Sequence, residues 1–212
     1  MMPKVWGLLA PVVLTATIAT TQPPPDETLH FAVLRDGNPI GTTTIRVQHG
    51  GPNLLAETVT HIKVKLGFLT LYTFDQSEIE HWADGHFQTL SAQTDDNGAR
   101  HTVSAQAEGG AIEVDADGKS RRIDRAIIPG SLWNPALVSQ KDVLDLQDGS
   151  IVPQHVLDRG IEQIALGGRP TAAHHYLIEG TFAQNVWYDQ DHRLVKMEMR
   201  GSDGSRIEYR LE

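Results

Sequence analysis

Residues 69–98 read LTLYTFDQSEIEHWADGHFQTLSAQTDDNG, and their pattern is the strongest fold signal in the chain. Apolar and polar side chains alternate through 69–82 and 86–94, and a period of two residues is typical of β-strands. Asp84-Gly85 separates the two runs, and Asn97-Gly98 follows the second. Such dipeptides accept the positive φ angles of tight hairpin turns. The stretch therefore predicts consecutive antiparallel strands joined by tight turns.

The same alternation continues on both sides of this stretch. Further runs of this kind lie at 29–34, 40–48, 54–66, 99–107, 111–116, 120–126, 151–157, 161–166, 171–179, 183–188, 193–199 and 205–211. So many strands must curl, close or stack, because wide flat sheets are unusual. The expected fold class is mainly all-β: a single large curved antiparallel meander sheet or half-barrel.

One segment interrupts the strand pattern. Asn134-Pro135 is typical of an N-cap followed by proline at the first helical position. This pair predicts one short helix near 134–146, in which 142–146 either extends the helix or starts a strand. Trp133 directly precedes it, and we expect its ring to fix the helix on the sheet or to stand at the mouth of a cavity.

Length and composition limit the classes of protein to consider. The chain has 212 residues, 40% of them hydrophobic and 21% charged, which suits one large domain. It has no cysteine, which excludes a disulfide framework, a thiolate metal site and a cysteine nucleophile. The net charge of −9 argues against non-specific binding to nucleic acids, so no nucleic-acid partner is expected.

The first residues have the layout of an export signal. Lys4 precedes an apolar run over 5–18, and small residues end the stretch at 19, so 1–19 is predicted to be a signal peptide. The run is too short for a comfortable membrane span, which favours cleavage over an uncleaved anchor, and no stable membrane insertion is expected afterwards. Residues 20–28, which contain three consecutive prolines, are expected to form an extended leader, and 29–212 a single curved antiparallel β domain. The predicted location is periplasmic or secreted.

The run at 69–82 also suggests a binding surface. One of its faces carries aromatic residues together with carboxylates, and the residues of that face are Tyr72, Phe74, Gln76, Glu78, Glu80 and Trp82. One interpretation is a core face that becomes solvated towards one end. The other is a pocket wall with an apolar body and a polar rim, which suits a ligand with a head group and a tail. On the second interpretation the candidate ligand-binding residues are Tyr72, Phe74, Glu80, Trp82 and Trp133, and the segment 66–69 adds an apolar crossing.

Motifs for chemistry are missing. The ten histidines lack the spacing of a helical zinc site, and His174 and His175 point to opposite faces of a predicted strand. There is no Gly-x-Ser-x-Gly elbow and no phosphate-binding glycine loop. Glu78 and Glu80 lie about 7 Å apart on one strand face, but any acidic β protein offers such carboxylate pairs. The sequence therefore predicts no catalytic residue, no metal site and no cofactor.

Several motifs taken together resemble a known family. They are Phe31-x-Val33-x-x-Asp36-Gly37-x-x-Ile40-Gly41, Glu80-x-Trp82-x-Asp84-Gly85, Thr94-Asp95-Asp96-Asn97-Gly98, Ser131-Leu132-Trp133-Asn134 and Trp187-Tyr188-Asp189-x-x-x-Arg193-Leu194. Their order resembles a family of exported bacterial proteins of unknown function, from about residue 29 to 211. That family is similar to envelope proteins with a curved antiparallel sheet, which include the lipoprotein carriers (the LolA/LolB-like fold). The resemblance implies a half-barrel that holds acyl chains under several helices, whereas this sequence predicts one short helix.

Three functions remain open on the sequence alone. The first is a soluble periplasmic protein that binds an apolar or amphipathic, lipid-like ligand in its curved sheet. The second is an envelope protein–protein interaction module, in which an exposed sheet edge accepts a strand of a partner. The third is an enzyme with a non-motif active site, for which a histidine beside a carboxylate, such as His81 or His86 near Glu80, would be needed.

Overall fold

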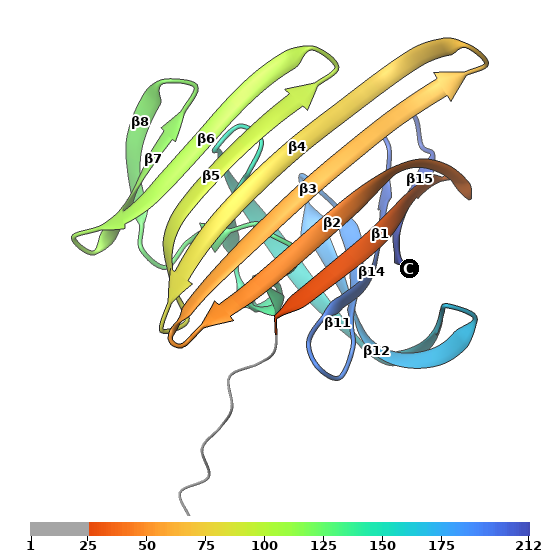
Figure 1. The fold of residues 1–212 in the computed structure, drawn as a ribbon. Helices are drawn as coiled ribbons and strands as arrows, with labels where there is room; N and C mark the ends of the chain where they lie inside the picture. The colour runs from red at the N-terminus through yellow and green to blue at the C-terminus, as the bar shows by residue number, and fades with distance from the viewer. Residues whose placement is uncertain (1–25) are drawn as a thin grey trace, which may run out of the picture.

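The computed structural model describes residues 26–212, so the predicted signal peptide and residues 20–25 of the leader lie outside it. The described residues form one mixed sheet of fifteen strands (Figure 1). The strands are β1 Glu27–Arg35, β2 Asn38–Gly50, β3 Asn53–Leu66, β4 Leu69–Ala83, β5 His86–Asp96, β6 Ala99–Glu108, β7 Ala111–Ala116, β8 Lys119–Asp124, β9 Ile128–Pro129, β10 Asp142–Leu144, β11 Ile151–Leu166, β12 Arg169–Gly180, β13 Gln184–Tyr188, β14 Leu194–Arg200 and β15 Arg206–Leu211.

The predicted hairpin turns are present. Both residues of four Asx-Gly turns have positive φ, as paired positive values in a tight two-residue turn require. These turns are Asp36-Gly37, Asp84-Gly85, Asn97-Gly98 and Asp117-Gly118. Because each turn reverses the chain tightly, consecutive strands pair side by side from β1 to β8.

The first and last strands of the chain, β1 and β15, lie next to each other in the middle of the sheet. Strands β1 to β8 extend to one edge, the chain then crosses to β9 at the other edge, and it returns strand by strand to β15. There β15 pairs with β1, with Phe31 opposite Leu211. All strand pairs are antiparallel except β9 with β10, which is parallel. The edges β8 and β9 do not pair with each other, so the curved sheet is not closed into a barrel.

The sheet folds back so that β11 to β15 lie behind β1 to β4 (Figure 1). Apolar side chains from the two halves pack against each other, and Phe31 and Ile45 share one core cluster with Ile178, Val186 and Met197. The strands alternate between buried and exposed positions, as β4 does from Glu78 to Trp82. The inner face, which in β4 carries these two residues and Glu80, therefore points into the space between the halves.

The segment that connects β8 to β11, residues 125–150, covers one end of this inner face. Ile127, Ile128, Leu144 and Leu146 pack with the apolar residues of β4 to β7. The connecting segment thus covers the sheet where the family resemblance implies several helices.

Two local expectations need correction, and the structure decides a third that was left open. The predicted helix near 134–146 is only a 3-10 turn over Pro135–Ser139, although Asn134 caps it as expected through a bond from the Ala136 N–H. Of the two alternatives left open for 142–146 the structure has the strand: residues 142–144 form β10, and Val143 and Leu144 are buried between β9 and β11. The runs 151–157 and 161–166 are a single strand, β11, in which a bulge between Asp158 and Gly160 absorbs the irregularity.

Candidate functional site

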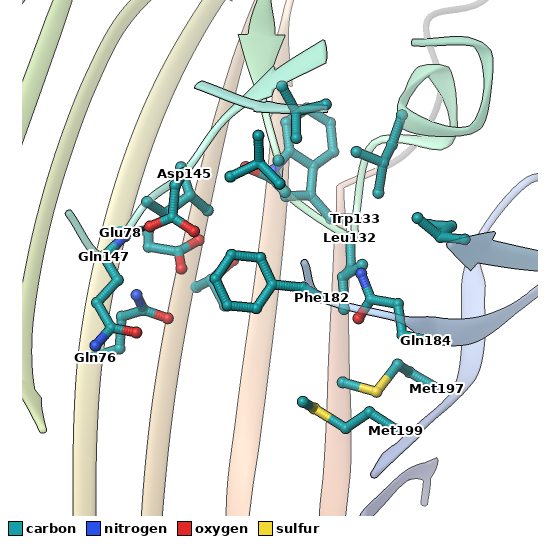
Figure 2. A pocket seen from close by; sticks show the side chains of 18 of the residues that line it. Gln76, Glu78, Leu132, Trp133, Asp145, Gln147, Phe182, Gln184, Met197 and Met199 are labelled. Atoms are coloured by element: carbon teal, nitrogen blue, oxygen red, sulfur yellow. Dashed lines mark hydrogen bonds between the residues drawn. The ribbon is translucent and has the colours of Figure 1, made fainter. Parts of the chain in front are cut away.

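A half-open cavity of about 250 Å³ lies between the two halves of the sheet. Its walls come from β1 to β4 on one side, from β11 to β15 on the other, and from the connecting segment at one end. The close-up in Figure 2 separates the lining residues into two groups. Carboxyl and amide side chains gather at one end, and methionines lie at the other.

The apolar end of the cavity is formed by flexible and aromatic side chains. Met197 and Met199 of β14 lie beside Gln184 in Figure 2, and Phe31 and Ile45 complete the lining from the opposite half. Methionine adapts its shape to irregular apolar partners, so this wall suits an apolar chain better than one rigid shape.

Phe182 lies between the two ends of the cavity (Figure 2). It belongs to the turn between β12 and β13 and is 46% exposed. Such a large apolar side chain is usually covered, and here its ring lines the cavity and also meets solvent. Phe182 therefore stands at the opening.

The polar end of the cavity contains Glu78, which is only 6% exposed. No described residue donates a hydrogen bond to its carboxyl group, and the charged groups that act on it are Glu80 and Asp145. Burial, with the repulsion of these two acids, raises the pKa of Glu78 to about 8. A large part of the Glu78 population is therefore protonated at neutral pH.

Asp145 reaches the same end from the connecting segment (Figure 2). Its Oδ1 accepts bonds from the backbone N–H groups of Gln147 at 2.7 Å and Asp148 at 3.0 Å. These bonds shape a turn that ends at Gly149, which has φ of +73° and where an added Cβ would lie 2.8 Å from the Cβ of Ala116. Burial raises the pKa of Asp145 as well, although these backbone donors oppose the shift.

Glu80, two residues from Glu78 on the same face, has the opposite surroundings. It accepts hydrogen bonds from Nε1 of Trp82 at 2.9 Å, from Nε1 of Trp133 at 3.1 Å and from Oγ of Ser131. Burial raises its pKa, and these three donors act against that rise. The rings of Trp82 and Trp133 meet edge to face, 5.9 Å apart. Glu80 therefore fastens the connecting segment to β4.

The five sequence-predicted site residues divide into two groups. Phe74 and Trp133 line the cavity, whereas Tyr72, Glu80 and Trp82 do not. Glu80 and Trp82 are buried in the core beside Trp133, and Tyr72 is half-buried farther along β4. The structure thus brings Trp82 and Trp133 together at the carboxyl group of Glu80, whereas Phe74 and Tyr72 lie elsewhere on β4.

Other lining residues were not predicted from the sequence. Asp145, Gln147 and Phe182 lie in turns, where no periodicity indicates a face, and Met197 and Met199 have the pattern of ordinary core positions in a strand. Glu78 was visible on the aromatic face of its strand, but no local signal distinguished it from Glu80.

The segment 66–69 does not form a wall of the cavity. It is the tip of the β3–β4 hairpin, where Phe68 is 99% exposed and Leu66 is 71% exposed. The tip extends past the neighbouring strands, because β2 pairs with β3 only as far as Ile62. Gly67 takes φ of +61° there, and glycine permits such a positive angle in a tight bend.

The histidines lie outside the lining of this cavity. Within 26–212, no group of three or more His, Asp or Glu side chains is placed to hold a metal ion. His81 and His86 are exposed, and His81 points away from the inner face that carries Glu80. In the same range no helix has the length and apolarity to cross a membrane.

Comparisons with known proteins bear on the fold and the family. A solved beta-barrel-like protein of the domain of unknown function DUF1849 from Brucella abortus is similar, with a TM-score of 0.64 and 10% identity over 89% of this chain and 95% of that chain. A DUF1089 family protein from Pseudomonas aeruginosa is more distant, with a TM-score of 0.36 and 14% identity over 86% of this chain and 94% of that one. No curated protein matches the sequence. The family described as "Domain of unknown function (DUF6134)" matches residues 31–212, so the chain belongs to this family, whose function is unknown.

Proposed function

We propose that this protein is exported to the bacterial envelope and binds an apolar or amphipathic small molecule between the two halves of its sheet. The observation that carries the proposal is the half-open cavity, which has an apolar end lined by methionines and a polar end lined by acids and amides. Cavities of this type, mostly apolar with a few polar groups, are typical of ligand sites. The pattern of residues 1–19 supports the location.

The driving force would be burial of apolar ligand surface. Each buried methylene contributes about 0.8 kcal/mol, so a short acyl or alkyl chain binds without any reacting group. The cost of immobilising the ligand reduces this gain, but the walls exist before binding, which keeps the cost low. The similarity to lipoprotein carriers suggested by the sequence motifs is compatible with this role and stays a prediction.

Native mass spectrometry tests ligand and export together. The full chain is produced in a bacterial host, recovered from the periplasm and measured before and after organic extraction. We expect a mass that begins at Thr20, together with an adduct that extraction removes. An adduct-free protein that also binds no added apolar probe contradicts the binding proposal. A protein that keeps residues 1–19 contradicts the proposed export.

A pair of matched variants locates the bound molecule. Met199→Trp adds volume at the apolar end of the cavity, whereas Val59→Trp adds a ring on the outer face of β3, where Val59 is 38% exposed. We expect the first variant to lose the adduct and the second to keep it. Equal retention by both variants places the molecule outside the cavity.

The other two functions have weaker support. The free edge of β8 carries Lys119, Arg121 and Arg122, and charged side chains on an edge strand discourage pairing with another strand. The enzyme hypothesis required a histidine beside a carboxylate in a cavity. No described histidine lines the cavity between the two halves, but His174, which pairs with Asp158 at 2.6 Å, lines a second cavity of about 540 Å³ beside the 3-10 turn.

A further inference from the structure

We propose that Glu78 and Asp145 recognise the positively charged head group of an amphipathic ligand, a protonated amine, whose apolar chain lies along the methionine end. This inference rests on the proposed function and adds the chemical class of the ligand. It starts from two carboxyl groups on one strand face, Glu78 and Glu80, that are both buried but have opposite surroundings.

Glu80 is satisfied by the protein itself and Glu78 is not. The first accepts bonds from two indoles and one hydroxyl, and the second accepts none from any residue in 26–212. In 26–212 the oxygens of Glu78 are not among the fully buried polar atoms that lack a partner, so they meet the open space of the cavity, where a carboxyl group normally finds a donor. Since Glu78 lines the cavity, a donor on a bound molecule would fill the gap.

The charges around the cavity favour a cation. The lining includes the acids Glu78, Asp145 and Glu179 and contains no lysine, arginine or histidine from the described part of the chain. Glu179 is exposed and already pairs with His155 at 3.1 Å. The carboxyl groups available to a ligand are therefore Glu78 and Asp145, which lie next to each other in Figure 2, and a cation favours the charged form of both.

The neighbouring amides present acceptors as well. The Nε2 group of Gln76 donates to Oγ1 of Thr94 at 3.0 Å, and that of Gln147 donates to Oδ2 of Asp96 at 3.3 Å. Their carbonyl oxygens receive no hydrogen bond from a described residue and remain to accept one. An ammonium group carries three donors and no acceptor, which matches such surroundings. A carboxylate head group would add a further negative charge among acids that already repel one another.

Binding of a cation should be linked to proton release. Burial and the nearby acids hold the pKa of Glu78 near 8 in the free protein, and a bound ammonium lowers it. The titratable groups that face Glu78 are Glu80 on its own strand, Asp145 on the connecting segment and Tyr209 on β15, whose pKa burial and Glu78 raise to about 12. At pH 7 the proton therefore leaves from the Glu78–Asp145 pair.

Three probes with the same chain and different head groups test the inference: octylamine, octanol and octanoate. An alkylamine is protonated at pH 7, as a lysine side chain is. Calorimetry on the purified protein measures each affinity, and tryptophan fluorescence, to which Trp133 in the cavity wall contributes, provides a second readout. We expect octylamine to bind about tenfold more tightly than octanol, because charge-assisted hydrogen bonds are stronger than neutral ones. Octanoate should bind most weakly, and octylamine should release protons, measured as a heat that varies with the ionisation enthalpy of the buffer.

Two variants distinguish the effect of the Glu78 carboxyl group on binding from the effect of the overall charge of the protein. Glu78→Gln keeps the shape of the side chain and removes its charge, and Glu57→Gln makes the same change on the outer face of β3, where Glu57 pairs with Arg46. We expect Glu78→Gln to lose the preference for octylamine and keep octanol binding, and Glu57→Gln to behave as the unaltered protein. Equal affinity for all three probes, or an unchanged preference in Glu78→Gln, overturns the head-group inference while octanol binding still supports the cavity. Failure of all three probes to bind contradicts the proposed function itself.

Discussion

The indole Nε1 of Trp133 donates a hydrogen bond of 3.1 Å to the carboxyl group of Glu80, across 53 residues of sequence. This bond joins the connecting segment to β4 near the C-terminal end of that strand. Tyr188 holds the same segment from the other half of the sheet, where its hydroxyl donates to the backbone oxygen of Leu132 at 2.9 Å. The segment that ends the cavity is therefore tied to both of its walls.

Removal of the Glu80 carboxyl group should destabilise the whole fold. Glu80→Ala leaves two indole donors and a hydroxyl without an acceptor and opens a void in the core. We expect a loss of about 3 kcal/mol or more in the free energy of unfolding, measured in urea at pH 7. Glu80→Gln keeps an acceptor oxygen and should lose less. Equal costs for Glu80→Ala and the outer-face variant Glu57→Ala would contradict the structural role of Glu80.

The stability of the protein should fall as pH rises towards 8. The pKa of Glu78 is about 8 when folded and near 4.5 when unfolded, so between these values the folded state binds more protons. The contribution of Glu78 to the free energy of unfolding is therefore present in full below pH 4.5 and is lost as pH rises to 8. It totals on the order of a few kcal/mol. Thermal unfolding at a series of pH values should show the decline as a falling melting temperature. The Glu78→Gln variant should have a flatter pH dependence and a higher melting temperature than the unaltered protein at pH 8. A parallel decline in both proteins assigns the titration to other groups.

Gly149 should tolerate alanine worse than another glycine of similar backbone geometry. At Gly149, φ is +73° and a Cβ would lie 2.8 Å from Ala116, whereas at Gly37, φ is +82° and a Cβ meets nothing within 4 Å. Gly37→Ala reports backbone strain alone, at about 1 kcal/mol. We expect Gly149→Ala to cost at least about 1 kcal/mol more, because the turn must move away from β7. Denaturant unfolding of the two variants measures the difference, and equal costs would show that the turn does not pack against this strand.

Phe182 should matter for binding and little for stability. Its side chain is 46% exposed, so Phe182→Ala should change the free energy of unfolding by less than about 1 kcal/mol. Because the ring lines the opening of the cavity, the affinity for octanol should fall about fivefold through lost apolar contact. Phe68→Ala is the control, since Phe68 is fully exposed at a hairpin tip away from the cavity. Equal octanol affinities in the two variants would remove Phe182 from the binding site.

The elements that the sequence predicted well are those coded by neighbouring residues. The alternation in 69–82 and the Asp84-Gly85 turn specify β4 and its hairpin with β5, since side chains of a strand point to alternate faces and glycine permits positive φ. The errors arose where local signals were short or ambiguous. Asn134-Pro135 predicts a short helix, but only a 3-10 turn over Pro135–Ser139 forms, and the burial of Val143 and Leu144 between strands decided between the two alternatives for 142–146.

The candidate site could be predicted only in part for the same reason. The sequence placed Phe74, Glu78 and Glu80 on one strand face beside aromatic residues, and they do share the inner face of the sheet. It could not indicate that Ser131 and Trp133 reach Glu80 while Glu78 receives no donor. Nor could it place Asp145 and Phe182, because turns have no periodicity from which a direction can be read.

The sequence by itself determined the strands, their turns and the two faces of each strand, because these depend on interactions within a few residues. The tertiary structure alone decided that β15 returns to pair with β1, that the two halves enclose a cavity, and that only one of two similar carboxyl groups is satisfied. These features depend on contacts between residues far apart in the chain, such as the 53 positions that separate Glu80 from Trp133. Such contacts form only when the whole sheet curves and buries its inner face, so no local pattern in the sequence records them.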